Sequence, residues 1–271
     1  MPLSRIQREI LGVLAAQRNP GSYIAGSSPL NESGPRYSLD IDIFHDRQEA
    51  VARAALRDVD TLSSENFAIA WIRRDPAIHT ARVSRAGENT KLEWAADSDY
   101  RFFPTVAHEM FGWVLHPVDL ATNKVAAAYG RREPRDIVDL ITVHEHILPL
   151  GAAVWAAADK APGFTPEGII NEIRRMARYT AAELAGVDSD PPVDPAAVTI
   201  TLRRILDEAE TFVLQMPTAQ VGRVYLLDGQ PVQPNPESLD RYQTHTARRQ
   251  GHWPSNVEIS AAMVDYYRKR H

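Results

Sequence analysis

The segment SLDIDIF, residues 38 to 44, places the strongest constraint on how this chain can fold, because it carries two aspartates within an apolar stretch. Its alternation of polar and apolar residues predicts a β-strand with one wet face. Residues i and i+2 of a strand point to the same face, so Asp40 and Asp42 stand side by side. Neighbouring carboxylates repel each other, and both stay ionised only when a cation lies between them. The pair is therefore either a cation site or a strand face in contact with water.

A glycine and a serine precede this strand. The apolar run YIAG, residues 23 to 26, predicts a short buried strand that ends in a glycine turn, and Ser27 follows it. Gly26 is either a plain turn residue or a point where backbone N–H groups approach a phosphate, with the Ser27 hydroxyl as a further donor. Because Mg²⁺ prefers carboxylate oxygens combined with substrate phosphates, the two motifs together favour metal-assisted phosphoryl or nucleotidyl transfer.

The composition excludes several classes of protein. A formal net charge of -5 argues against a polycation that binds nucleic acid with its whole surface. The chain has no cysteine, which excludes disulfides and Cys-ligated metal sites. The N-terminus is too charged for a signal peptide, and the stretch ILPLGAAVWAAA is too short to cross a membrane. We expect a cytoplasmic protein with no membrane partner, and a monomer by default.

Hydrophobic periodicity predicts an α/β N-terminal half followed by a helical C-terminal half. Strands are expected at residues 23–26, 38–44, 67–74, 79–85 and 90–96, with a hairpin turn at AGEN between the last two. Helices are expected at residues 4–17, 47–60, 118–130, 134–148, 152–160, 166–185, 195–215 and 256–269. Residues 27–37 are rich in Ser, Asn, Gly and Pro and predict a loop, and DSDPPVDP (188–195) and DGQPVQPNPES (228–238) predict loop or linker segments.

Glu93, in the segment KLEWAA, is the best candidate for a third acidic residue beside the aspartate pair. Its neighbours Leu92 and Trp94 would face the core, which leaves Glu93 on the opposite face of its strand. An ordinary exposed strand residue is an equally good interpretation. Asp97 and Asp99 lie beyond the strand and are weaker candidates.

Two motifs carry a resemblance to a known family. The pattern formed by Gly26, Ser27, Arg36, Ser38, Asp40 and Asp42 resembles the nucleotidyltransferase superfamily of the DNA polymerase beta type. The spacing between the two halves of the pattern is slightly longer than is usual there, and the segment NESGP accounts for the excess. The stretch DLATNKVAAAYGRREPRDIVDL, residues 119 to 140, resembles the Lys-containing helix and Arg-Asp motif of AbiEii-like toxins of bacterial toxin–antitoxin systems, which include the MenT-like group.

The resemblance spans residues 23 to 140, about half of the chain, and implies a fold and a domain organisation. It implies an α/β (α+β) protein in which residues 1–115 form a nucleotidyltransferase core with a mixed sheet flanked by helices. Residues 116–271 would form a helical domain that contributes Lys124 and Asp136 to the site. No motif in the C-terminal half matches the family.

The resemblance also implies roles for single residues. Asp40 and Asp42 would be catalytic ligands of Mg²⁺ or Mn²⁺, with Glu93 as a possible third ligand. Lys124 would be a catalytic ligand of the NTP triphosphate, although a lysine on an apolar helix face can also extend its ammonium to water. Asp136 would be a catalytic residue that orients Lys124, or else an acid stabilised by the helix dipole.

The remaining motif residues would hold the nucleotide. Gly26, Ser27 and Ser38 would contact NTP, with Ser38 beside Asp40 on the same strand face. Arg36 would contact phosphate, or else be a solvated loop residue. Asp139, one helical turn beyond Asp136, is expected to be structural.

The family modifies tRNA, which implies transfer of NMP from an NTP to the 3′ end of tRNA, with loss of aminoacylation and translation. It also implies a cognate antitoxin. Possible RNA contacts are Arg174 and Arg178, which would share a helix face, and Arg248 and Arg249 in the basic tail. Transfer to a protein hydroxyl or to a small molecule such as an aminoglycoside is an alternative. A catalytically idle nucleotide-binding regulatory module is another.

Overall fold

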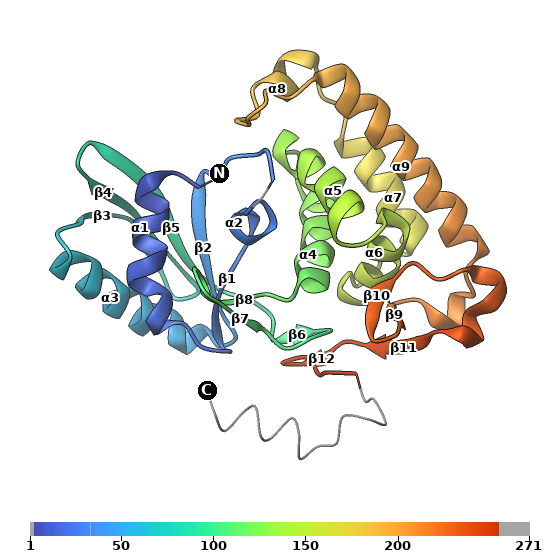
Figure 1. Ribbon diagram of the computed structural model, residues 1–271, viewed down its shortest axis with the longest axis horizontal. Coiled ribbons are helices and arrows are strands. Elements are labelled where there is room, and N and C mark those ends of the chain that lie inside the picture. The colour runs from blue at the N-terminus through green and yellow to red at the C-terminus, as the bar shows by residue number, and fades with distance from the viewer. Residues whose placement is uncertain (1–2, 33, 255–271) are drawn as a thin grey trace.

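The computed structural model describes residues 3–32 and 34–254 (Figure 1). The helix expected at residues 256–269 and the last basic residues of the tail lie outside the described residues. The described chain consists of an N-terminal sheet with its helices and a mainly helical C-terminal part. The expected division at residue 115 remains a prediction.

The N-terminal half is built on a seven-stranded mixed sheet with the strand order β3-β4-β5-β2-β1-β8-β7. Its strands are β1 (Ser22–Ala25), β2 (Asp40–His45), β3 (Ala68–Asp75), β4 (Ile78–Arg85), β5 (Glu88–Ala96), β7 (Val106–His108) and β8 (Gly112–Val114). The β2–β5 and β1–β8 pairs are parallel and the others antiparallel. The predicted mixed sheet is therefore confirmed.

The expected hairpin joins β4 to β5 through a two-residue turn. Arg85 pairs with Glu88, and Ala86 and Gly87 between them have φ values of 52° and 83°. Positive φ at both central residues is the geometry that matches the twist of a tight hairpin. This turn fixes the register of β5, and so fixes which of its side chains face the carboxylates of β2.

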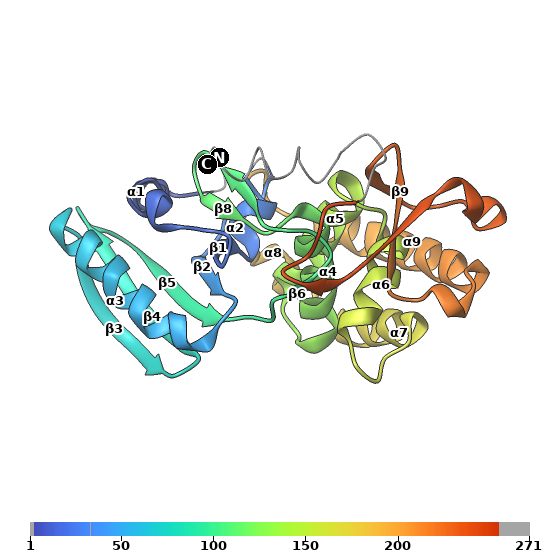
Figure 2. The same ribbon diagram turned by 90° about the horizontal axis from the view of Figure 1, so that it is seen from below.

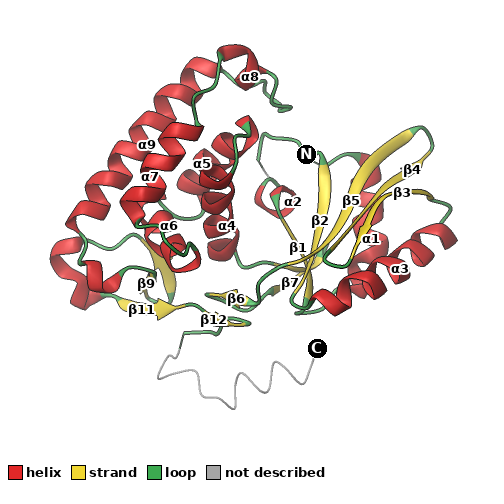
Figure 3. Cartoon of the chain, turned by 180° about the vertical axis from the view of Figure 1, so that it is seen from behind, coloured by secondary structure: helices red, strands yellow, loops and turns green. Residues whose placement is uncertain are grey.

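Helices α1 (Arg5–Leu14) and α3 (Gln48–Ser64) pack on one face of this sheet (Figures 1 and 3). Their apolar side chains form a core with Ile41, Ile43, Leu92 and Trp94, which are fully buried. Because strand residues alternate between faces, Asp40, Asp42 and the β5 residues in register with them lie on the other face. The sheet thus has a helix-covered apolar face and a chemically active face.

The C-terminal half is helical. Its helices are α4 (Pro117–Gly130), α5 (Pro134–His146), α6 (Leu150–Ala157), α7 (Pro166–Met176), α8 (Ala181–Ala185) and α9 (Pro195–Gln215). Proline occupies the first turn of α4, α5, α7 and α9, where its missing N–H has no intrahelical partner in any case. The single helix expected over 166–185 is wrong: Thr180 forms a capping box with Glu183 and starts α8 as a separate helix.

Short elements complete the chain. A short α2 (Ser27–Leu30) follows Gly26 inside the expected loop. Short 3₁₀ helices cover Ala15–Gln17, Ala158–Lys160, Thr218–Gln220 and Pro236–Arg241, the last with a kink at Ser238. A three-stranded sheet of β9 (Arg223–Leu227), β10 (Gln230–Val232) and β11 (Gln243–Thr246) was not predicted, and it includes part of the expected loop at 228–238.

The two halves are joined by buried polar contacts. The Asp119 carboxylate on α4 accepts hydrogen bonds of 2.9 Å from the backbone N–H groups of Phe102 and Phe103, and the Lys160 Nζ lies 2.7 Å from it. In addition, β12 (Arg248–Arg249) returns from the end of the described chain to pair with β6 (Tyr100–Arg101) (Figure 2). These contacts hold α4 and α5 in place opposite the active face of the sheet.

No single helix in the described ranges has the length and apolar character to cross a membrane, whereas Pro134–His146 and Leu150–Lys160, bent by 110°, reach that threshold only as a pair.

Candidate active site

A pocket of about 250 Å³ lies between β1, β2 and β5 on one side and α4 and α5 on the other. Its lining brings together eight of the residues singled out from the sequence: Gly26, Ser27, Arg36, Asp40, Asp42, Glu93, Lys124 and Asp136. It also contains residues that the sequence did not assign to the site: Lys91, Asn123, Arg131, Arg135, and Asp139, which was expected to be structural. Residues from positions 26 to 139 therefore converge on one site.

The acidic side chains come from adjacent parallel strands. Asp42 on β2 is in register with Glu93 on β5, as Asp40 is with Lys91. Burial raises the pKa of Asp42 to about 7, and the neighbouring Asp40 and Glu93 carboxylates add to the shift. The protein on its own thus disfavours full ionisation of the group, and a bound cation would reverse that preference.

Gly26 is required by the position of Asp42. A Cβ atom at residue 26 would lie 2.1 Å from Asp42 Oδ2, closer than any real contact, and the residue has φ +71°. Glycine adopts this conformation without strain, and its missing side chain leaves room for the carboxylate. The glycine is therefore more than a plain turn residue, because it allows β1 to approach the aspartate pair.

Serine hydroxyls fix the backbone beside the aspartates. Ser38 Oγ lies 2.8 Å from Ser27 Oγ and donates a 2.7 Å hydrogen bond to the backbone carbonyl of Asp40. The Ser28 hydroxyl also donates to Ser38 Oγ, at 3.1 Å. The expectation that Ser38 shares a strand face with Asp40 is wrong, because β2 begins only at Asp40 and Ser38 is buried in the irregular segment before it.

Lys124 is oriented by Asp139. The Lys124 Nζ lies 2.7 Å from Asp139 Oδ2, and Arg36 donates to the same carboxylate through Nε at 2.8 Å and Nη2 at 2.9 Å. The Asn31 side-chain amide adds a hydrogen bond of 3.1 Å. Burial alone would raise the pKa of Asp139, but Lys124 and Arg36 outweigh that effect and lower the pKa to about 2. The carboxylate is therefore ionised and holds both cations.

This network corrects two expectations. Arg36 is not a solvated loop residue, since it is buried and forms a two-point ion pair with Asp139. Asp136 does not orient Lys124: it pairs with Arg131, whose Nε and Nη2 lie 2.7 and 2.9 Å from its two oxygens. The sequence placed both aspartates on α5 but could not show which of them meets the lysine of α4.

The residues proposed as RNA contacts lie away from this pocket. Arg174 is paired with Asp207 and Glu210, each at 2.8 Å. The expected helix face shared by Arg174 and Arg178 does not exist, because α7 ends at Met176.

The basic residues at the end of the described chain differ in their contacts. Arg249 is paired with Asp99 at 2.8 Å, whereas Arg248 is exposed on β12. A role of these arginines in binding RNA remains a prediction.

The donor set fits a magnesium ion held jointly with a nucleotide. Within residues 3–32 and 34–254, no three His, Cys, Asp or Glu side chains form a group that could hold a metal ion. Asp40 and Asp42 supply two carboxylates, which is the number that Mg²⁺ commonly takes from a protein when substrate phosphates complete its shell. Glu93 lies 3.5 Å from Thr80 Oγ1 and 3.4 Å from Lys91 Nζ, so its role as a third ligand remains a prediction.

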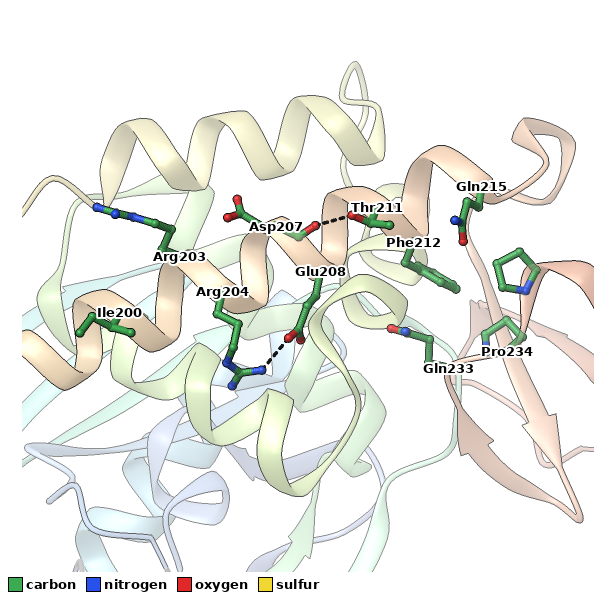
Figure 4. Close-up of a pocket in the computed structure, with 11 residues that line it drawn as sticks. Ile200, Arg203, Arg204, Asp207, Glu208, Thr211, Phe212, Gln215, Gln233 and Pro234 are labelled. Atoms are coloured by element: carbon green, nitrogen blue, oxygen red, sulfur yellow. Dashed lines mark hydrogen bonds and ion pairs between the residues drawn. The ribbon is translucent and has the colours of Figure 1, made fainter.

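A larger hollow of about 680 Å³ lies along the outer side of α9, next to Gln233 and Pro234 (Figure 4). Its charged residues are paired with one another or with a neighbouring helix: Arg204 pairs with Glu208 at 2.8 Å, and Asp207 pairs with Arg174 of α7 at 2.8 Å. The residues that line this hollow do not include a pair of neighbouring carboxylates facing a lysine, as the pocket at the aspartate pair does.

Comparison of the structure with solved structures identifies two similar proteins. MenT4, a nucleotidyltransferase toxin from Mycobacterium tuberculosis, matches with a TM-score of 0.55 and 15% identity over 79% of this chain and 84% of its own. A protein from H. pylori, provisionally assigned as a nucleotidyltransferase, matches with a TM-score of 0.47 and 14% identity over 78% of this chain and 94% of its own. No family model and no curated protein matches the sequence. On the similarity to MenT4, the chain has the fold of a MenT-like nucleotidyltransferase.

Proposed function

We propose that this protein is a nucleotidyltransferase toxin that uses Mg²⁺ or Mn²⁺ to transfer NMP from an NTP to the 3′ end of tRNA. One observation carries the proposal. Asp40 and Asp42 line the same pocket as Lys124, whose ammonium is held by a buried carboxylate. Paired carboxylates facing a fixed cation suit the transfer of a nucleotide from its triphosphate, because one side holds the metal and the other the phosphates.

Different residues of the pocket would bind the metal ion and the phosphates. Asp40 and Asp42 would hold the metal ion, whose chemistry when bound is to neutralise the triphosphate and acidify the attacking hydroxyl. Lys124, kept in place by Asp139, would bind the β- and γ-phosphates. Ser27 would donate a hydrogen bond to phosphate from the other side of the pocket.

The reaction forms one bond and breaks one. The oxygen of the acceptor hydroxyl bonds to the α-phosphorus while the bond from that phosphorus to the bridging oxygen breaks. Pyrophosphate leaves with its new charge next to the Lys124 ammonium, and the hydroxyl proton passes to solvent. Stabilisation of the charge that develops on the leaving group is the main contribution that fixed cations make to such transfers.

A tRNA with a nucleotide added to its 3′ end cannot be aminoacylated, so this activity would stop translation in the cytoplasm. Such an enzyme requires control by a cognate antitoxin. The fold similarity to MenT4, which is a toxin, supports this part of the proposal. We further propose that the protein acts as a monomer and that Arg248 and Arg249 lie near the bound RNA.

The test is transfer of label to tRNA. Purified protein is incubated with Mg²⁺, each α-labelled NTP in turn, and total tRNA, beside tRNA whose 3′ ribose has been oxidised with periodate. We expect label on intact tRNA only. Asp42→Asn should abolish the label, whereas Asp60→Asn, an exposed aspartate of α3, should retain it. Label on a protein or small molecule in a cell extract, with none on tRNA, would refute tRNA as the acceptor.

A further inference from the structure

Lys91 lies among the carboxylates of the candidate site. It is on β5, two residues before Glu93 and in register with Asp40 on β2, so its side chain is on the active face of the sheet. Its Nζ lies 3.0 Å from Asp40 Oδ2 and 3.4 Å from Glu93 Oε2. One ammonium group therefore bridges two of the three carboxylates that β2 and β5 contribute to the site, which are Asp40, Asp42 and Glu93.

The other cationic side chains of the pocket lie next to different carboxylates, and Arg135 Nε is 3.9 Å from Glu133. Lys124 and Arg36 are paired with Asp139, and Arg131 is paired with Asp136. Lys91 differs from them because its partners are the very carboxylates that a metal ion would use. Its side chain is also 42% exposed, whereas those of Lys124 and Arg36 are 9% and 2% exposed.

We propose that Lys91 is an internal counter-ion that occupies the carboxylate oxygens of the site until a metal ion displaces it. This inference rests on the proposed function only in taking Asp40 and Asp42 as the metal ligands. The ammonium partly neutralises an acidic cluster whose members would otherwise repel one another. Because the lysine side chain is long and half exposed, it can move into solvent or onto a nucleotide phosphate without any change in the backbone.

The consequence is competition between the ammonium and a free metal ion. A metal ion that binds Asp40 must break the 3.0 Å contact to Lys91 and accept a nearby positive charge. Once the ammonium has moved to about 8 Å from a divalent ion, and with the screening of water, its charge still changes the affinity for that ion by about fivefold. Free metal is therefore bound weakly, and a metal ion that arrives with its nucleotide is favoured because the phosphates receive the displaced ammonium.

The experiment measures metal binding without nucleotide and without turnover. Free Mn²⁺ is titrated into the wild-type protein and into Lys91→Met, and bound ion is followed by electron paramagnetic resonance. Arg82→Met is the matched control: Arg82 is in register with Lys91 on β4 and is exposed, and among the described residues it forms no ion pair with the carboxylates of the site. Circular dichroism checks that the variants are folded.

We expect Lys91→Met to bind Mn²⁺ about fivefold more tightly than wild type, and Arg82→Met to change the affinity by less than twofold. Equal affinities of Lys91→Met and wild type would overturn the inference, as would a lack of binding by both, because removal of the ammonium would not have opened the site. A failure of the proposed function is recognised separately, as an absence of nucleotide transfer in a protein whose Mn²⁺ affinity does respond to Lys91.

Discussion

Asp42→Asn should make the metal-free protein more stable at neutral and alkaline pH while it destroys the site. The pKa of Asp42 rises from its usual value of 3.8 to about 7 because the group is buried beside Asp40 and Glu93. A raised pKa means that the folded state favours the protonated carboxyl. The contribution of Asp42 to the stability of wild type is then fully present below pH 4 and is lost as the pH rises through 7, and asparagine, which does not ionise, removes this loss.

The size of the effect follows from the shift. Each pKa unit corresponds to about 1.4 kcal/mol, so a shift of about three units gives roughly 4 kcal/mol as an upper limit. Asp42 is only partly shielded from solvent, and we expect about 2 to 4 kcal/mol above pH 7. For a chain of 271 residues this corresponds to a rise in melting temperature of roughly 3 to 7 °C.

Thermal unfolding of both proteins in EDTA at pH 8 and near pH 4 measures the difference. Asp42→Asn should melt roughly 3 to 7 °C above wild type at pH 8 and close to wild type near pH 4. Asp60→Asn should melt close to wild type at both pH values. Saturating Mg²⁺ should then stabilise wild type and leave Asp42→Asn unchanged. If Asp42→Asn melts at or below the wild-type temperature at pH 8 in EDTA, the reasoning about this cluster is refuted.

Three further outcomes are expected. Asp139→Asn should destabilise the protein by about 3 to 5 kcal/mol, measured by urea unfolding, because it leaves the buried Lys124 and Arg36 without their anion; an unchanged midpoint would contradict this. Gly26→Ala should reduce nucleotide transfer at least tenfold, because the new Cβ atom clashes with Asp42. Gly87 also has positive φ but has nothing within 4 Å of an added Cβ, so Gly87→Ala should cost about 1 to 2 kcal/mol of stability and no activity. Equal loss of transfer in both variants would argue against the clash. A chelator should abolish transfer reversibly, and activity that persists in excess EDTA would rule out a metal ion.

Strands β1 to β5 were predictable because each carries its own signal, whereas the strands β6, β7, β8 and β12, of two or three residues each, were not predicted. Alternating polar and apolar residues predicted a strand at 79–85, and β4 covers Ile78–Arg85. The spacing of two residues between Asp40 and Asp42 in SLDIDIF likewise predicted that both side chains lie on one face of the strand. The small sheet of β9 to β11 was missed because its strands are three to five residues long and are interrupted by proline-rich loops. Such short strands are determined by their neighbours more than by their own sequence.

Eight of the residues that line the pocket were predicted from the sequence, but the ion pairs among the pocket residues were not. Periodicity placed Lys124 and both aspartates of α5 on helices, but the partner of the lysine depends on how α4 packs against α5. The signal for Asp139 was a carboxylate in the middle of the apolar turn DIVDL, where an unpaired charge would be costly. Lys91 could have been found by the same parity argument that selected Glu93, since both lie on one face of a strand.

Transfer of a nucleotide by this pocket differs from transfer of a terminal phosphate in which phosphate of the NTP reaches the acceptor. A label at the α- or at the γ-phosphate distinguishes the two reactions. The wild-type protein is incubated with Mg²⁺, a cell extract and the same NTP labelled either at the α- or at the γ-phosphate. We predict that macromolecules gain the α-label and not the γ-label, that labelled pyrophosphate is released from γ-labelled NTP, and that Asp40→Ala/Asp42→Ala does neither. Transfer of the γ-label, or equal α-labelling by the double variant, would contradict the account.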